Sequence, residues 1–264
     1  MGFEFNLIYL FFFYPLLYMG LIYLTMPIGS IKIKDMFKAV AMGYVSVTFL
    51  HFMYLIFPPE GEILQTAFSR YFYIVAPREE IAKFLSFLIL VKYGISKIKQ
   101  PIVYMVLCGL VGLGFGIEEN IIYYQRHGDE VLLIRNFCAL LAHLFFGMFA
   151  GYFYGLGKLH EGYEDIKSNI GKFLNKLPKL KLAFYGFFGV FMGVLYHGLW
   201  NYNLQTSGFA SEAIMILMLI CGGLGVYLMG KDLIKGHRER ISSNRDESSI
   251  LKQQWLEGDG PQTD

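Results

Sequence analysis

Long stretches without any Asp, Glu, Lys or Arg constrain the fold of this chain more than any other feature. A helix needs roughly 20 apolar residues to cross a hydrocarbon core about 30 Å thick. Five stretches reach this length with no charged residue, and two more of similar length are interrupted by charges. The pattern predicts seven membrane-spanning helices, at residues 5–31, 39–59, 71–91, 101–124, 137–157, 182–211 and 213–230.

The overall composition supports an all-α, polytopic membrane protein. The chain is 55% hydrophobic and only 17% charged, and its mean hydropathy is +0.44, which lies outside the usual range of soluble proteins. Its 23 Lys+Arg nearly balance its 21 Asp+Glu, so no basic excess points to a nucleic-acid partner. The 3 cysteines form no CxxC pair, which argues against a disulfide framework and a cysteine zinc site.

The distribution of Lys and Arg predicts the topology. These residues concentrate in the connections after the first, third and fifth spans and in the C-terminal segment, whereas the other connections hold few. The positive-inside rule then places the N-terminus outside and the C-terminus in the cytoplasm. We expect residues 1–235 to form one transmembrane domain of a multi-pass plasma-membrane protein. Residues 236–264 are polar and are expected to form a disordered or loosely helical cytoplasmic tail.

Ionisable side chains inside the spans mark a candidate functional site. Charges are costly in the bilayer centre, so those within residues 71–91 and 101–124 are functional candidates by default. At about 1.5 Å per residue, these carboxylates and two histidines of later spans all lie roughly 8–14 Å below the outer surface. The residues that share this depth are Glu79, Glu80, Glu118, Glu119, His143 and His197.

Helical spacing suggests how some of these groups pair. Glu79 and Lys83 are four residues apart, so the ammonium could neutralise that carboxylate. His197 and Asn201 have the same spacing, so the amide could orient the imidazole. Pro77 can kink its helix and admit water beside the carboxylates. A carboxylate and an imidazole around one water are what hydrolysis of a peptide carbonyl requires.

Four ordered motifs within residues 71–204 give the chain a resemblance to a known family. They are Glu79-Glu80-Ile-Ala-Lys83, Phe115-x-x-x-Glu119-Asn120, His143 with Gly147, and His197-Gly-Leu-Trp-Asn201. Together they resemble the signature set of the PrsW family of intramembrane proteases. The first and last motifs are also similar to those of the wider CPBP and CAAX-prenyl-endopeptidase (Rce1-type) group.

The resemblance implies an endopeptidase that cuts transmembrane or membrane-proximal protein substrates near the outer leaflet. It further implies site-1-type cleavage of a regulatory membrane protein. Glu79 and Glu80 would supply the general base, His143 would help to activate water, and His197 with Asn201 would stabilise the oxyanion. Glu119 and Asn120 match the PrsW-specific motif, and Glu118 beside them leaves open which carboxylate faces the site.

Metal dependence and two other classes of function stay open. The family has also been classed as metalloproteases, and His143, His197 and a glutamate could bind zinc. The sequence lacks HExxH, so we favour a metal-free glutamic mechanism. The same charges could instead line the ion pathway of a transporter, although polar groups should then extend through the full thickness. A non-catalytic membrane scaffold would tolerate Glu79→Gln.

Overall fold

The computed structural model describes residues 3–58, 66–95, 97–129, 132–160, 178–206 and 211–257, and within these ranges the only regular elements are helices. Several short elements follow one another without a break, so the described residues form seven continuous helical segments. The segments are α1 (Phe3–Thr25), α2 (Ile33–Ile56), α3–η2–α4–η3 (Ala67–Ser69, Arg70–Val75, Ala76–Ile89, Leu90–Gly94), α5 (Ile102–His127), α6–η5–α7 (Leu132–Ile134, Arg135–Ala139, Leu140–Leu159), α9 (Pro178–Thr206) and α10 (Ser211–Glu257).

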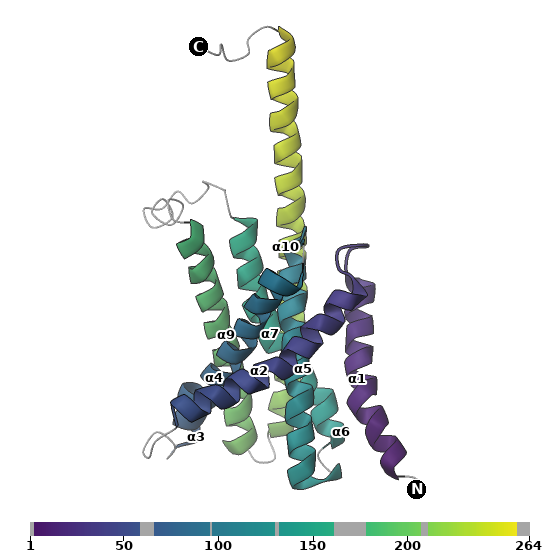
Figure 1. Ribbon diagram of the computed structural model, residues 1–264, viewed down its shortest axis with the longest axis vertical. Coiled ribbons are helices and arrows are strands. Elements are labelled where there is room, and N and C mark those ends of the chain that lie inside the picture. The colour runs from purple at the N-terminus through teal and green to yellow at the C-terminus, as the bar shows by residue number, and fades with distance from the viewer. Residues whose placement is uncertain are drawn as a thin grey trace.

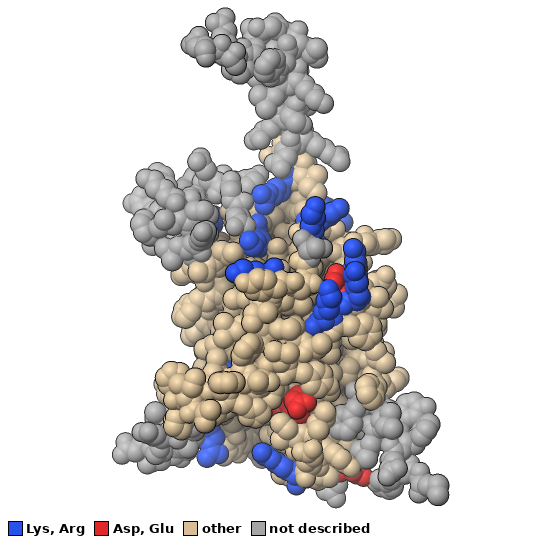
Figure 2. All heavy atoms as spheres, in the orientation of Figure 1, with Lys and Arg blue, Asp and Glu red and all other residues tan. Residues whose placement is uncertain are grey.

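The structure confirms the prediction of an all-helical membrane protein. Five helices are long and apolar enough to cross a membrane, and they lie within α2, α5, α6–α7, α9 and α10. The described apolar part of α1 is shorter, and the segment containing α4 carries the intramembrane charges. In Figure 2 an extended, largely uncharged surface lies below the Lys and Arg side chains that gather near the end from which α10 projects. The exact number of spans and the sides of the termini stay predictions.

The centre of the bundle is the pair α5 and α7, and α2 crosses in front of α5 at a steep angle (Figure 1). Glycines allow these backbones to touch. A Cβ on Gly112 of α5 would overlap the carbonyl oxygen of His143 in α7, and one on Gly147 of α7 would overlap that of Cys108 in α5. These glycines therefore allow the two helices to pack closely. The contact fixes where α5 and α7 present their polar side chains to each other.

We expect Gly112→Ala to destabilise the fold by about 1–3 kcal/mol, because the added methyl group must push two helix backbones apart. Thermal unfolding in detergent micelles would measure the change. Gly225→Ala in α10 is the matched control, since a Cβ there would meet its nearest neighbour at 3.6 Å, an ordinary contact distance. Equal stability of the two variants would show that the backbone contact is dispensable.

The C-terminal segment is helical in the part that the structure describes. Residues 236–257, for which we expected a disordered or loosely helical tail, continue α10 to Glu257. The segment after Gly236 contains no Gly or Pro before that point, and it is rich in Arg, Glu, Lys and Gln, which favour helices. These propensities outweigh the missing apolar face.

Candidate active site

The structure gathers side chains from four helices into one buried polar cluster. α4 contributes Glu79, Glu80 and Lys83, and the rest come from α5, α7 and α9. The imidazole rings of His143 and His197 lie 5.3 Å apart between their centroids. The exposed fractions of the cluster are small, with Lys83 at 1%, Glu80 at 2% and Glu79 at 7%. Such burial of ionisable groups is costly unless each is paired, so the pairing decides what each group can do.

The first turn of α4 places the two adjacent glutamates. Pro77 lies in the first turn of α4 but inside a continuous helical segment, so it has no N–H to donate to the turn before it, and the helix is irregular there. The irregularity lies just before it, in the π-helical segment η2. Such wide turns are frequent at functional sites. Glu79 and Glu80 follow directly and project from the helix about 100° apart.

Lys83 pairs with Glu80, which corrects the expected pair with Glu79. Its Nζ lies 2.5 Å from Glu80 Oε1, and the two residues are three apart in the helix. Spacings of three and four both bring helical side chains together, so the sequence alone did not distinguish the partners. Glu80 Oε1 also accepts a hydrogen bond of 2.7 Å from His197 Nδ1. One oxygen of Glu80, Oε1, is therefore held by two donors.

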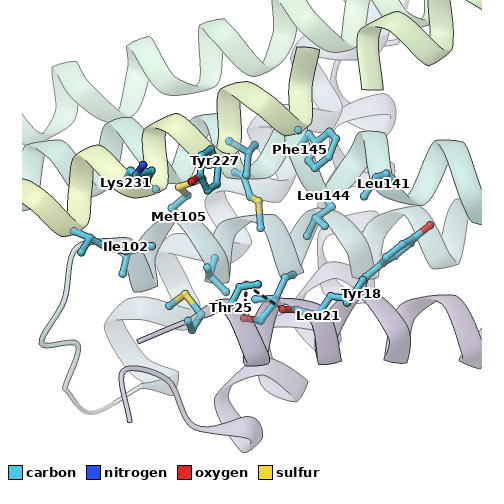
Figure 3. Close-up of a pocket in the computed structure, with 18 residues that line it drawn as sticks. Tyr18, Leu21, Thr25, Ile102, Met105, Leu141, Leu144, Phe145, Tyr227 and Lys231 are labelled. Carbon is cyan, nitrogen blue, oxygen red and sulfur yellow. Dashed lines mark hydrogen bonds between the residues drawn. The ribbon is translucent and has the colours of Figure 1, made fainter. Parts of the chain in front are cut away.

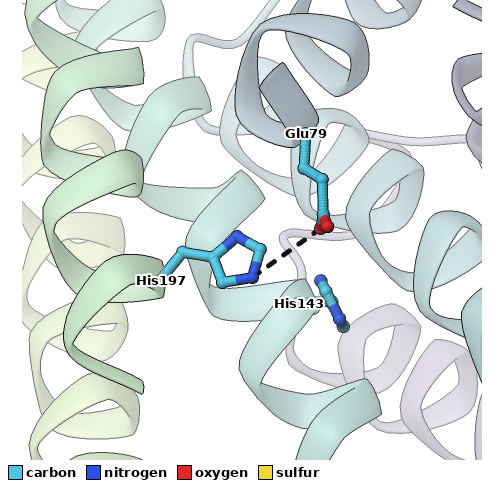
Figure 4. Close-up of side chains that lie close together, drawn as sticks. All are labelled: Glu79, His143 and His197. Carbon is cyan, nitrogen blue, oxygen red and sulfur yellow. Dashed lines mark ion pairs between the residues drawn. The ribbon is translucent and has the colours of Figure 1, made fainter. Parts of the chain in front are cut away.

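These contacts determine the tautomer of His197. Because Nδ1 donates to Glu80, Nε2 carries the lone pair, and it accepts a hydrogen bond of 3.1 Å from Asn201 Nδ2. The predicted contact between Asn201 and His197 is thus present. Nε2 also lies 3.7 Å from Glu79 Oε2, as Figure 4 shows. His197 is accordingly held as a neutral base that faces Glu79.

His143 has a similar arrangement on the other side of the cluster. Its Nε2 lies 2.9 Å from Glu119 Oε2, and its Nδ1 lies 3.3 Å from Lys83 Nζ. Since the ammonium can only donate, Nδ1 accepts from it and Nε2 donates to Glu119. Glu118, the neighbour of Glu119, is only partly buried and forms no hydrogen bond or ion pair with the residues that the structure describes. Only one carboxylate of this pair therefore belongs to the cluster.

Glu79 is the carboxylate that remains available. Its Oε2 is buried and has no hydrogen-bond partner among the described residues. One ligand atom from each of Glu79, His143 and His197 lies within 4.8 Å of the other two, and Figure 4 shows the three side chains converging. A buried carboxylate oxygen without a partner is expensive and calls for a functional explanation. The geometry suits either a water molecule or a metal ion between these groups.

The candidate site residues lie in a region that matches a known protein family. The sequence model of the PrsW family of intramembrane metalloproteases matches residues 33–224, which include every candidate site residue. The chain belongs to the PrsW family. Similar proteins include Protease PrsW of Oceanobacillus iheyensis, 28% identical over 56% of this chain and 60% of the relative. Protease PrsW of Geobacillus kaustophilus is 27% identical over 48% of this chain and 59% of the relative.

The chain thus spans about three fifths of each of these curated relatives. No solved structure matches the chain. The resemblance to the PrsW family is confirmed, whereas the relation to the prenyl-endopeptidase group stays a prediction.

The structure adds Arg135 to the cluster, a residue just before the predicted fifth span at 137–157. Arg135 Nη2 donates to Glu119 Oε2 at 2.7 Å, and its Nε donates to Asn120 Oδ1 at 2.9 Å. The guanidinium also lies over the Tyr123 ring, 3.5 Å from its centroid. The PrsW-specific Glu119-Asn120 pair is therefore clamped by one arginine. The spacing of 135, 139 and 143 on one helical face was a signal that could have revealed it.

We expect Arg135→Gln to reduce cleavage by about tenfold to a hundredfold, because Glu119 would lose its cation and hold His143 less well. The loss should appear in kcat more than in KM, since Arg135 acts on the orientation of His143. Arg135→Lys keeps the charge and should recover part of the activity, although it cannot hold Glu119 and Asn120 simultaneously. The control is Arg126→Gln, which removes an exposed arginine from the last turn of α5. Unchanged kcat in Arg135→Gln would contradict this role.

Proposed function

We propose that this chain is an intramembrane endopeptidase that hydrolyses peptide bonds with a water molecule activated by Glu79 and His143. Membership of the PrsW family supports a protease, and one observation supports the assignment of the base. Among the three carboxylates of the cluster, Glu80 is held by Lys83 and Glu119 is held by Arg135, whereas Glu79 Oε2 has no hydrogen-bond partner among the described residues. Glu79 is therefore the carboxylate best able to accept a proton.

The water would lie between Glu79 and His143. The contact of Lys83 with His143 Nδ1, at 3.3 Å, is the longest hydrogen bond in the cluster, and a water that replaces this donor can donate to Nδ1. Glu79 accepts a proton from the water while the new carbon–oxygen bond forms at the scissile carbonyl. The second N–H of Asn201 can donate to the resulting oxyanion. Desolvation makes both interactions stronger than in water.

The role of His197 differs from the one that the resemblance implies. Its Nε2 carries no proton in the tautomer that Glu80 imposes, so it cannot donate to an oxyanion. It lies 3.7 Å from Glu79 Oε2 and can receive the proton that Glu79 takes from water. The resulting imidazolium would be stabilised by Glu80 and could then protonate the leaving amine. We therefore assign His197 to proton transfer and Asn201 to the oxyanion.

A zinc-dependent version of the same reaction is the second candidate, because the donors fit zinc. Glu79, His143 and His197 supply the two imidazoles and one carboxylate typical of catalytic zinc sites, and each imidazole is tied through its other nitrogen to a carboxylate. Zinc would polarise the carbonyl and acidify a bound water. Glu79 would then be a ligand, and both remaining carboxylates of the cluster are paired with cations. This lack of a second free base favours the metal-free mechanism.

The site is expected to open toward the outer leaflet. Figure 1 shows α3 and α6 near the end opposite to the projecting part of α10. α4 and α7 follow these short helices through the π-helical segments η2 and η5, so their first turns, which carry Glu79 and His143, lie in that half of the bundle. Substrates would be membrane proteins cut within or beside a span, and a regulatory single-span protein fits site-1-type cleavage. We also place the protein in the plasma membrane.

The deciding experiment is cleavage of a tagged library of single-span proteins by the purified chain in liposomes, with and without a zinc chelator, alongside a metal analysis. We expect the wild type to cut in both conditions. Loss of cleavage with chelator, restored by zinc, would establish the metal mechanism instead. Absence of cleavage by a protein that still unfolds cooperatively, and is therefore folded, would refute the protease proposal. The next measurement would then be proton-driven ion flux across the same liposomes.

A further inference from the structure

An apolar cavity lies on a part of the bundle separate from the polar cluster. It has a volume of about 400 Å³ and lies between α1 and α10, with α5 and α7 behind it (Figure 3). Its lining is mostly apolar, and the polar side chains in it are Tyr18, Thr25, Tyr227 and Lys231. The Thr25 hydroxyl donates to carbonyl oxygens of its own helix, Leu21 and Ile22, each at 3.0 Å, and Lys231 Nζ lies 5.2 Å from the centroid of the Tyr227 ring. Water needs polar partners, so this cavity suits a hydrocarbon chain better than water.

A second cavity of about 400 Å³ lies at the Lys-rich end of the bundle, where α5 begins and α7 ends. Among the described residues, its lining includes four basic side chains, Lys99, Lys158, His237 and Arg240, and no Asp or Glu. Arg240 is fixed in place, because its Nη1 donates to the carbonyl oxygen of Leu159 at 2.8 Å. A pocket of this composition at the cytoplasmic level of a helical bundle suits an anionic headgroup.

One face of α10 lines both cavities in succession. Its residues 223, 227, 230 and 234 border the apolar cavity, and residues 237 and 241 border the basic one. The alternating steps of four and three residues keep them on a single helical face. Along this face the surroundings change from apolar to cationic toward the end that the positive-inside rule assigns to the cytoplasm. A phospholipid has the same order of properties, from acyl chain to phosphate.

We propose that the two cavities bind one anionic phospholipid of the cytoplasmic leaflet, with an acyl chain between α1 and α10 and the phosphate among Lys99, Lys158, His237 and Arg240. A substrate helix is a poorer occupant, because none of the candidate site residues lines either cavity. The bound lipid joins α1 and α10 to the pair α5 and α7. Its binding should therefore stabilise the bundle that holds Glu119 and His143 in place.

The test compares phosphatidylglycerol with phosphatidylcholine of identical acyl chains. The full-length protein is purified in detergent with an equimolar mixture, and the lipids that stay bound are quantified by mass spectrometry. We expect the wild type to retain phosphatidylglycerol preferentially and to unfold at a higher temperature when it is added. Lys99→Gln should lower this preference about fivefold, as the loss of one interfacial cation implies. Gly230→Leu should abolish the retention by filling the apolar cavity.

Two variants serve as matched controls. Lys92→Gln removes another exposed lysine at the same end of the bundle but outside both cavities, and Gly225→Leu adds the same side chain to α10 away from them. A Cβ at Gly225 or at Gly230 meets its nearest neighbour at 3.6 Å, so the first carbon of the new side chain fits equally well at both positions. Both controls should keep the preference of the wild type. If Lys99→Gln and Lys92→Gln lowered the preference for phosphatidylglycerol equally, the lipid would be attracted by the overall surface charge rather than bound in a site. That result would overturn the proposal.

Soluble ligands separate the possible sources of the phosphate. Inorganic phosphate and glycerophosphoglycerol carry the headgroup chemistry without an acyl chain. We expect neither to raise the unfolding temperature at millimolar concentration. If these soluble anions raised the unfolding temperature and the protein showed no preference between the two lipids, the ligand would be a soluble phosphate compound. That result would overturn the proposal.

Discussion

Glu79→Gln is expected to lower the rate of cleavage by about a thousandfold while the protein stays as stable as the wild type. The loss follows from removal of the general base, which typically contributes 10² to 10⁴ in rate, as a rough range. Stability should be kept because Glu79 Oε2 has no hydrogen bond to lose among the described residues, and glutamine removes a costly buried charge. The measurements are single-turnover cleavage in liposomes and thermal unfolding of the same preparations.

Glu118→Gln is the control for this experiment, since it changes a carboxylate outside the cluster in the same way. We expect it to cut at close to the wild-type rate. If Glu79→Gln also cut at that rate, Glu79 would be neither base nor metal ligand, and the scaffold or transport alternatives would gain support. If Glu79→Gln unfolded at a much lower temperature, its carboxylate would have a structural role instead.

Lys83→Met is expected to destabilise the protein by about 3–5 kcal/mol, because it leaves the carboxylate of Glu80 buried without its cation. Methionine keeps the length and apolar stem of lysine, so the change isolates the charge. Lys83 Nζ also lies 4.6 Å from the centroid of the Phe115 ring, and that cation–π contact would be lost too. Denaturant or thermal unfolding in micelles measures the effect.

The double variant Glu80→Gln/Lys83→Met provides the control. Removing both charges leaves no uncompensated ion, so we expect the double variant to be more stable than Lys83→Met alone. If the losses in free energy of unfolding of the two single variants added up in the double variant, the two side chains would act independently. Lys83→Arg would not serve as a control, because the site of Lys83, whose side chain is only 1% exposed, has no room for the larger guanidinium.

The sequence predicted the helical class and the cluster for one physical reason. Charged groups are so costly in hydrocarbon that uncharged stretches indicate the spans, and a charge inside a span indicates a candidate functional site. Glu79, Glu80, Lys83, His143 and His197 were found in this way, and the structure brings them together. Their catalytic roles stay predictions, because proximity alone does not show chemistry.

The details that the sequence did not provide depend on side-chain partners rather than on residue type. Helical spacing allowed Lys83 to reach either neighbouring glutamate, and only the fold selects Glu80. Arg135 joins the cluster through contacts with residues in another helix, which a loop position does not reveal. The polar C-terminal segment continues α10 because its helix-forming residues suffice, although it lacks the apolar face that we required.

The glycine contacts described above also bear on how a substrate reaches the site. Besides the α5–α7 contact, glycines bring α2 against the backbone of α5 at Gly43 and α9 against that of α7 at Gly189, whereas no described glycine brings another helix backbone against α4. Backbones in contact cannot separate without losing close packing, but side-chain contacts can slide or exchange rotamers. The described glycines of α1 and α10 likewise touch no backbone of another helix, so α4 shares this looser kind of packing with them. Because α4 carries Glu79, a movement of this helix would also carry the proposed proton acceptor away from His143 and His197.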